Sequence, residues 1–168
     1  VISYNAAISA CEKSVQWERA LQVLAEMREC DLRPTVISYS AVISACERSV
    51  QWERALEMMG EMHRQDFEPD VIVYNALMDA CKKGEQWERA LTCLADMRKA
   101  KVESDAISYN TAISACEKGM QWEFALWILQ EMRHCELEVD VITYNAALSA
   151  CEKGQQWELA LVILSGLQ

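Results

Sequence analysis

Apolar residues recur along the chain at helical spacing, in two alternating segments of about a dozen residues each. In the first segment, the apolar positions i, i+3, i+4 and i+7 hold Tyr4, Ala7, Ile8 and Cys11. These positions fall within an arc of about 100° on a helical wheel, the pattern of an amphipathic α-helix. The spacing therefore predicts a helix over roughly residues 3–13.

The second segment has the same helical spacing but begins with a large aromatic residue. Its apolar positions hold Trp17, Ala20, Leu21, Leu24 and Met27. Glu18 lies in the first turn, where a carboxylate favours the N-terminal end of a helix. We expect a second helix over about residues 17–29, and hence a helical hairpin.

The segment between the two predicted helices is a short turn. It reads Ser14-Val15-Gln16 in its first copy and contains Gly84, Gly119 or Gly154 in later copies. Glycine suits the left-handed conformation that often ends a helix, so we expect these glycines to adopt it. A polar connection with Pro34 or Pro69 closes the first two hairpins.

The hairpin pattern repeats every 35 residues from one end of the sequence to the other. The repeats are 1–35, 36–70, 71–105, 106–140 and a truncated 141–168, which we interpret as a single array over 1–168. A period of this length is typical of solenoids, because one hairpin cannot bury its apolar face alone. We predict an all-α fold, an α-solenoid of stacked helix-turn-helix hairpins. The apolar residues of the last, unfinished helix are Leu161, Ile163, Leu164 and Leu167.

Several columns of the repeat are predicted to be structural. The tryptophans at Trp17 and its equivalents are expected to wedge between successive hairpins, and Ala10 and Ala20 to allow close helix approach. The methionines on the same stripe are expected in the core: Met27, Met62, Met97 and Met132.

Composition narrows the class of protein. Of 168 residues, 52% are apolar and 25% are charged, which excludes a disordered chain. The longest apolar run, 160–164, is far shorter than the roughly 20 residues of a membrane span, so no membrane insertion is expected. The net charge of −10 argues against nonspecific nucleic-acid binding.

The eight cysteines look at first like a disulfide framework or a metal site. Five of them occupy one repeated position, no CxxC occurs, and His63 and His134 have no ligand spacing. We expect reduced, mostly buried thiols and neither metal nor cofactor. The chain starts at Val1 without an initiator Met, signal or visible transit peptide, which we interpret as an excerpt or a processed product.

The combined motif resembles the pentatricopeptide repeat (PPR). It consists of period 35, V-I-S-Y-N-A-x-I-S-A-C-E-K at the start, W-E-x-A-L in the second helix, E-M-R near its end, and P-D, S-D or V-D at the close. The phrase I-S-A-C-E-K-G-x-Q-W-E is similar to PPR tracts of dinoflagellate algae. The resemblance implies a right-handed superhelix and a protein of the mitochondrion or chloroplast that acts in organellar RNA processing, stability or translation.

The resemblance also implies a site: single-stranded RNA read at one base per repeat, as other helical-repeat proteins read it. The fifth and last residues of each repeat would contact the base edge: Asn5 with Thr35, Ser40 with Asp70, Asn75 with Asp105, Asn110 with Asp140, and Asn145 without a partner. The second residues would clamp the base faces: Ile2, Ile37, Ile72, Ile107 and Ile142. The alternative for these isoleucines is packing at the helix start.

The chemistry of these pairs suggests a sequence preference. Asn offers a donor and an acceptor and reaches a pyrimidine, short Ser leaves room for a purine, and ionised Asp only accepts, which suits the imino N–H of U or G. The family's code then implies 5′-pyrimidine-G-U-U-pyrimidine-3′, read parallel to the protein.

A cationic column accompanies this face. On the first helix, positions 2, 5, 9, 12 and 13 form a second arc turned away from the apolar stripe. Position 13 is always basic: Lys13, Arg48, Lys83, Lys118 and Lys153. Such a column suits a phosphate backbone, although Glu12 and its equivalents adjoin it. The alternative is that each cation only solvates the helix end and complements its dipole.

Two other functions are alternatives to RNA binding. A protein-interaction scaffold, or a structural subunit of a larger organellar complex, would also suit a solenoid of charge −10. An enzyme has little support, because no Ser-His-Asp, Cys-His or metal-ligand set occurs. RNA binding without catalysis is the leading hypothesis.

Overall fold

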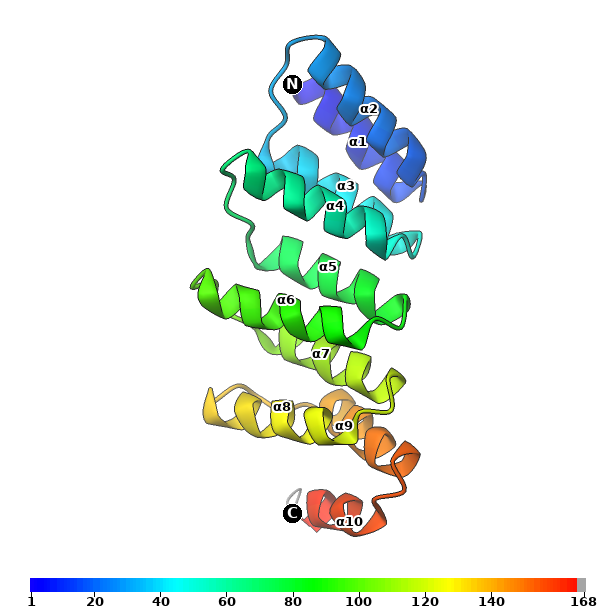
Figure 1. The fold of residues 1–168 in the computed structure, drawn as a ribbon, viewed down its shortest axis with the longest axis vertical. Coiled ribbons are helices and arrows are strands. Elements are labelled where there is room, and N and C mark those ends of the chain that lie inside the picture. The colour runs from blue at the N-terminus through cyan, green and yellow to red at the C-terminus, as the bar shows by residue number, and fades with distance from the viewer. Residues whose placement is uncertain (166–168) are drawn as a thin grey trace. The chain divides into compact units, whose positions relative to one another are not determined.

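The computed structural model describes residues 1–165, which form ten α-helices and no strand (Figure 1). The helices are α1 (Ile2–Lys13), α2 (Trp17–Glu29), α3 (Val36–Arg48), α4 (Trp52–Arg64), α5 (Val71–Lys83), α6 (Trp87–Lys99), α7 (Ala106–Lys118), α8 (Trp122–His134), α9 (Val141–Lys153) and α10 (Trp157–Ser165). The first two lie within one residue of the predicted ranges, and the pair recurs at the 35-residue period. No helix in residues 1–165 is long and apolar enough to cross a membrane.

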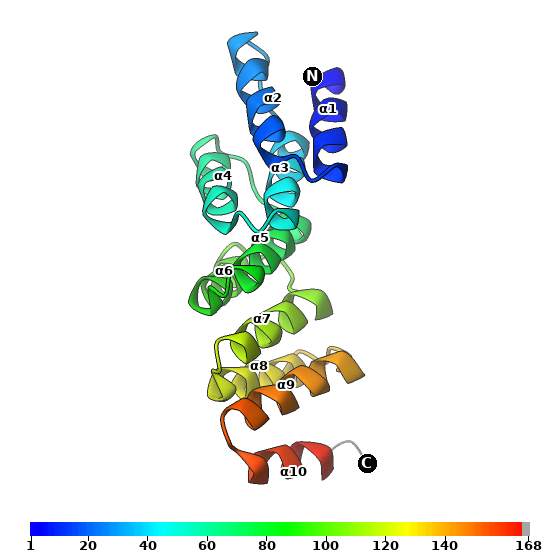
Figure 2. The same cartoon turned by 90° about the vertical axis from the view of Figure 1, so that its right-hand side faces the viewer.

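The chain divides into two compact units, Val1–Gly84 and Glu85–Gln168. In the first unit α1, α3 and α5 form a contiguous row, and α2 and α4 pack beside it (Figure 2). In the second unit α7 packs on α9, and α6, α8 and α10 pack against these two helices. The chain is an all-α solenoid of helical hairpins, as predicted.

The first helix of the second hairpin, α3, is buried more widely than the sequence pattern indicates. In α3, Tyr39, Val42, Ile43 and Cys46 are buried as predicted from the stripe, because they face the hairpin partner. The buried set also includes Ser38, Ala41 and Ala45. These small residues are covered because α3 contacts α1 on one side and α5 on the other.

The second helices α2, α4, α6 and α8 each bury a single stripe. The buried residues of α4 are Ala55, Met59 and Met62. All four methionines predicted to be in the core are completely buried: Met27, Met62, Met97 and Met132. In α10, by contrast, Leu161 and Leu164 are exposed, and Leu167 lies outside the described residues.

The prediction for the turn glycines was wrong. Gly84, Gly119 and Gly154 have φ between −76° and −83°, an ordinary right-handed value. The left-handed position is the next residue: Val15, Val50, Glu85, Met120 and Gln155 have φ of 56° to 59°. Glycine is needed for a different reason, since a Cβ on Gly84 would collide with the indole ring of Trp52. The same ring contact faces Gly119 and Gly154, so Trp52, Trp87 and Trp122 lie between successive hairpins as predicted, whereas Trp157 is exposed.

The cysteines within residues 1–165, which include all eight, form no disulfide. At the repeated position, Cys46, Cys81, Cys116 and Cys151 are buried. Burial raises the pKa of the Cys46 thiol to about 11 and that of Cys116 to about 12, so both stay protonated and unreactive at neutral pH. Cys30 and Cys135 are exposed.

Candidate nucleic-acid interface

Isoleucines are exposed at the start of each first helix. The exposed fractions are 87% for Ile2, 64% for Ile37 and Ile72, 61% for Ile107 and 68% for Ile142. A side chain this exposed contributes little to packing at the helix start. The isoleucines form a regular exposed column, which is accessible to a partner as the base-clamping prediction requires.

The side chain of Asn5 lies between two residues of the following connection and helix. Its Nδ2 donates to Thr35 Oγ1 at 3.4 Å, and its Oδ1 accepts from Ser38 Oγ at 2.6 Å. The fifth and last residues of the first repeat are therefore in direct contact. Their polar groups lie beside the exposed Ile37 at the start of α3.

The fourth repeat has the same arrangement with a carboxylate in place of the hydroxyl. Asn110 Nδ2 donates to Asp140 Oδ2 at 3.5 Å. The Thr143 hydroxyl lies within hydrogen-bond reach of both Asn110 Oδ1 and Asp140 Oδ1, and so links the two residues. In two of the predicted base-reading pairs, the two residues are thus hydrogen-bonded to each other.

The last residue of each repeat has a second role that the sequence interpretation missed: it caps the next helix. The caps are Thr35 on α3, Asp70 on α5, Asp105 on α7 and Asp140 on α9. The sequence signal was available, because Thr or Asp before an apolar helical run is the usual N-cap, followed here three residues later by Ser38, Ser108 or Thr143.

Capping affects the charge of Asp140. Hydrogen bonds from the side chain and the backbone of Thr143 lower the pKa of Asp140 below its ordinary value. The carboxylate is therefore ionised at neutral pH and acts only as an acceptor. Its Oδ1 is used by the cap, whereas Oδ2 faces Asn110.

The remaining predicted base-reading residues lie at the same helical positions. Ser40 donates its hydroxyl to the Val36 carbonyl at 2.8 Å, so its oxygen keeps acceptor capacity. Asp70 accepts from the Val73 amide at 3.0 Å. Asn75 is half-buried on α5, and Asn145 is exposed on α9.

Three of the five cations in the predicted phosphate column are engaged by carboxylates of the preceding repeat. Arg48 lies 3.7 Å from Glu12, Lys153 lies 2.8 Å from Glu117, and Lys83 forms a close ion pair with Glu47. The sequence showed these glutamates beside the column, but not that they pair across the hairpins. These three cations are partly neutralised and would have to exchange partners to meet a phosphate.

Lys13 and Lys118 are the two cations of the column without an ion pair among the described residues, and both are exposed. They are the members of the column most available to an anion. The alternative role, complementing the helix dipole, applies equally to all five residues, because each lies in the last turn of its helix.

An arginine near the end of the second helix joins three helices, which the sequence interpretation did not assign. Arg28 of α2 donates to the Tyr39 hydroxyl of α3 at 3.1 Å and pairs with Glu61 of α4 at 2.6 Å. Arg98 contacts Tyr109 at 3.1 Å and Glu131 at 2.9 Å in the same way. The arginine of the E-M-R motif is thus part of hairpin stacking.

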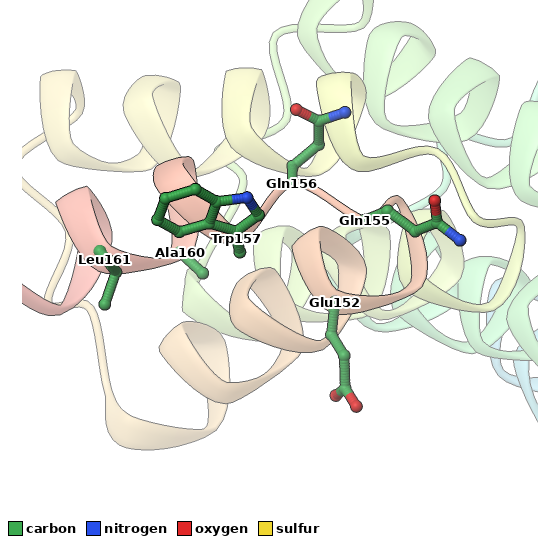
Figure 3. A pocket seen from close by; sticks show the side chains of 6 residues that line it. All are labelled: Glu152, Gln155, Gln156, Trp157, Ala160 and Leu161. Atoms are coloured by element: carbon green, nitrogen blue, oxygen red, sulfur yellow. The ribbon is translucent and has the colours of Figure 1, made fainter.

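A pocket at α10 has a volume of about 460 Å³. Figure 3 shows the Trp157 indole beside Ala160 and Leu161, with the Glu152 carboxylate directed away from it. The indole is 67% exposed, whereas its counterparts Trp52, Trp87 and Trp122 lie against the turn glycines. The pocket therefore presents the hairpin-stacking surface rather than a ligand site. Residues 1–165 contain no cluster of three or more potential metal ligands.

A separate aromatic patch lies on the outer helices, at Phe124 and Trp127 of α8. Their exposed fractions are 42% and 48%. In the first three repeats the equivalent positions are polar: Arg19, Arg54 and Arg89, and Gln22, Glu57 and Thr92. The Arg98 guanidinium lies 5.7 Å from the Trp127 ring centroid, a cation–π contact.

Solved structures with this fold support the architecture. The chain is similar to the pentatricopeptide repeat protein PPR10 from maize, with TM-score 0.76 and 25% identity over 99% of this chain. PPR10 in complex with an 18-nt psaJ RNA element matches with TM-score 0.80 and 20% identity over the same share. This chain spans about a quarter (24%) of the length of those proteins.

A third structure is similar over most of both chains. The PPR domain of Arabidopsis thaliana protein-only RNase P 1, in complex with tRNA, matches with TM-score 0.82 and 14% identity, covering 95% of this chain and 84% of that one. No curated protein matches the chain.

Family models match the sequence from end to end. The PPR repeat family model matches residues 1–48, 34–83 and 69–118, the PPR repeat model matches 107–137, and the pentatricopeptide repeat domain model matches 127–167. Together with the hairpin solenoid, these matches identify the chain as a member of the pentatricopeptide repeat family.

Proposed function

We propose that the chain binds single-stranded RNA in a sequence-selective manner and without catalysis, reading one base per repeat. The observation that carries the proposal is the contact between the fifth and last residues of a repeat, Asn5 with Thr35 and Asn110 with Asp140, beside exposed isoleucines. Polar groups fixed next to an apolar clamp are what recognition of an unstacked base requires.

The family supports the same role. PPR10 was solved with an RNA element and the PPR domain of protein-only RNase P 1 with tRNA, which makes RNA the natural ligand to test. We place the protein in the mitochondrion or chloroplast, in RNA processing, stability or translation, because PPR proteins generally act there. The target preference proposed is 5′-pyrimidine-G-U-U-pyrimidine-3′.

The experiment is a fluorescence-anisotropy titration of the 168-residue chain with labelled RNA 12-mers. One RNA contains U-G-U-U-U and the other has the central G-U-U replaced by A-A-A. We expect at least about tenfold tighter binding of the first, since each correctly met hydrogen bond contributes about 1 kcal/mol. Equal affinity for the two RNAs would contradict selective reading.

The cation column makes a separate test of RNA contact. Lys118→Ala should reduce the slope of log affinity against log salt by about 0.7, the value for one phosphate contact to a single strand. Lys153→Ala should have a smaller effect, because Lys153 is already paired with Glu117. If both variants changed the slope by the same small amount, Lys118 would not contact the RNA backbone.

A protein-interaction scaffold is the second candidate, and the aromatic patch favours it. Exposed Phe124 and Trp127 replace polar residues of the first three repeats on a helix that carries no base-reading residue. The double variant Phe124→Arg and Trp127→Gln restores the residues of the first repeat. If it releases a partner protein from the purified complex while RNA affinity stays unchanged, the patch serves a scaffold role.

A further inference from the structure

A buried hydroxyl holds the base-reading asparagine in two repeats. Ser38 and Thr143 are the third residues of their repeats, and both side chains are completely buried. The Ser38 hydroxyl donates to the Oδ1 of Asn5, 33 residues earlier. The Thr143 hydroxyl has one hydrogen and lies within reach of two acceptors, Oδ1 of Asn110, again 33 residues earlier, and Oδ1 of the capping Asp140. Because a hydroxyl that donates needs an acceptor, the bond directs the amide oxygen inward.

The other end of each amide is held as well. The Nδ2 groups of Asn5 and Asn110 donate one N–H to Thr35 and Asp140. An amide nitrogen carries two N–H groups, so one donor is left over while the oxygen is already engaged. The asparagine therefore has a defined polarity toward the solvent face.

We propose that the hydroxyl at the third position of the following repeat is a positioning residue that orients the asparagine to present an N–H donor to the RNA base. The inference rests on the proposed RNA-binding function and deepens it. The donor matches a carbonyl acceptor on the base, such as the O2 that uracil and cytosine share. Because the amide oxygen is directed toward the buried hydroxyl, the asparagine meets the base with its N–H, which suits the carbonyl O2 of a pyrimidine.

The third residue of a repeat varies together with the fifth residue of the preceding repeat. Three of the four asparagines at the fifth position are followed in this sequence by the third position of another repeat, and each time it is a hydroxyl residue: Asn5 by Ser38, Asn75 by Ser108 and Asn110 by Thr143. Ser40 is followed instead by Val73, which has no hydroxyl. A residue that served only to cap the helix would have no reason to follow the identity of the fifth residue.

The second repeat presents the opposite polarity. The Ser40 hydroxyl donates to the Val36 carbonyl, which leaves its oxygen as an acceptor, and Asp70 is also an acceptor. Two acceptors suit the N1–H and N2–H groups of guanine. The presence or absence of the buried hydroxyl thus separates donor repeats from an acceptor repeat.

The test replaces Thr143 by valine, which has the same shape without the hydroxyl. Valine is tolerated at this position of the fold, because Val73 occupies it in α5 with 1% exposure. We measure the affinity of the full chain for U-G-U-U-U RNA and for the same RNA with A at the fourth base. Thr143→Val should reduce the preference for U about three- to tenfold, the value of one hydrogen bond.

Three controls separate positioning from stability. Thr143→Ser keeps the hydroxyl and should retain the preference, and the preference for G at the second base should be unchanged in Thr143→Val. In the unaltered chain the Asn110 side-chain amide protons should give sharp, well-separated NMR signals, which Thr143→Val should merge or broaden.

The outcomes are distinguishable. If the unaltered chain shows no preference at the fourth base, the proposed function fails and the inference fails with it. If the unaltered chain is selective but Thr143→Val retains the full preference, the positioning role alone is overturned. An unchanged Asn110 amide signal in Thr143→Val would also overturn it, whatever the RNA affinities.

Discussion

Glu47 in α3 and Glu117 in α7 occupy the same position of their repeats, yet their pKa values are shifted in opposite directions. Burial raises the pKa of Glu47, and a hydrogen bond with Asp79 raises it further. Burial would raise the pKa of Glu117 too, but hydrogen bonds from Lys153 and Ser149 outweigh it and lower the pKa. Each glutamate also meets the cation at position 13 of the next repeat.

The difference comes from one residue, the ninth of the following repeat. Asp79 of α5 takes the place that Ser149 has in α9. A second carboxylate beside Glu47 disfavours its ionised form, while a hydroxyl beside Glu117 stabilises that form. Asp79 itself is ionised, since hydrogen bonds from Glu47, Lys82 and Lys83 overcome its burial and lower its pKa to about 2. Identical residues in a repeat protein can therefore have opposite energetic roles.

The largest expected effect concerns a feature common to the junction of α3 with α5 and the junction of α7 with α9, the packing of a turn glycine against a tryptophan. Gly84→Ala and Gly154→Ala should each lower the free energy of unfolding by about 1–3 kcal/mol, because the added methyl group collides with Trp52 or Trp122. Urea denaturation followed by circular dichroism measures the loss. Gly60→Ala is the matched control: it has open space and should stabilise by up to about 1 kcal/mol. If only one of the two variants were less stable, the two glycine–tryptophan contacts would be packed differently.

The second largest effect is a difference in stability between the Glu117→Gln and Glu47→Gln variants. Glu117→Gln should cost about 1 kcal/mol, because it removes a partly exposed ion pair and leaves Lys153 without its partner. Glu47→Gln should be neutral or stabilising, since it relieves the contact with Asp79 and leaves Lys83 paired with that carboxylate. A double-mutant cycle of Glu117 with Lys153 isolates the pair energy. Equal losses in the two single variants would contradict the comparison.

The third prediction exchanges the residue that causes the difference. Asp79→Ser should move the pKa of Glu47 from above its ordinary value to below it, as for Glu117. Ser149→Asp should raise the pKa of Glu117. Carboxyl ¹³C titrations by NMR report both values, and Thr92→Ser on α6 provides a control that touches neither glutamate. If Asp79→Ser leaves Glu47 raised, burial alone is responsible.

The smallest effect is the pH dependence of stability. A carboxylate with a lowered folded-state pKa stabilises above its unfolded pKa of about 4.3 and loses that contribution as the pH falls, which describes Glu117. Glu47, with a raised folded-state pKa, contributes stability that increases as the pH falls toward the same value. Glu117→Gln should reduce the loss of stability that occurs as the pH falls below about 5. Glu47→Gln should remove the gain in stability that occurs as the pH falls toward about 5. Parallel profiles for the two variants would contradict the assigned directions.

Much of the fold could be predicted because it is encoded locally. The apolar spacing and the five-fold repetition located the helices to within about a residue at α1 and α2. The site was less accessible. The wheel placed Asn5 and Ile37 on the solvent face, but the link from Asn5 to Ser38 spans 33 residues and depends on how one hairpin docks on the next.

One wrong prediction from the sequence and one omission have the same origin. Glycine at the turn suggested a backbone role, whereas its function is to make room for a tryptophan 32 residues earlier. The sequence showed glutamates beside the cations of position 13, but not that three of these cations pair with glutamates of the preceding hairpin. Spacing within one segment does not reveal which side chains meet across segments.

The sequence by itself determined that this protein is a stack of helical hairpins, because helix formation and amphipathic periodicity depend on neighbours three and four residues away. Only the tertiary structure decided which polar groups are occupied. Whether Asn5 keeps an acceptor, whether Lys153 is available and whether Glu47 is readily ionised all depend on side chains of the adjoining repeat. Hydrogen bonds and burial act over a few ångströms in space, and stacking brings those distant positions within reach.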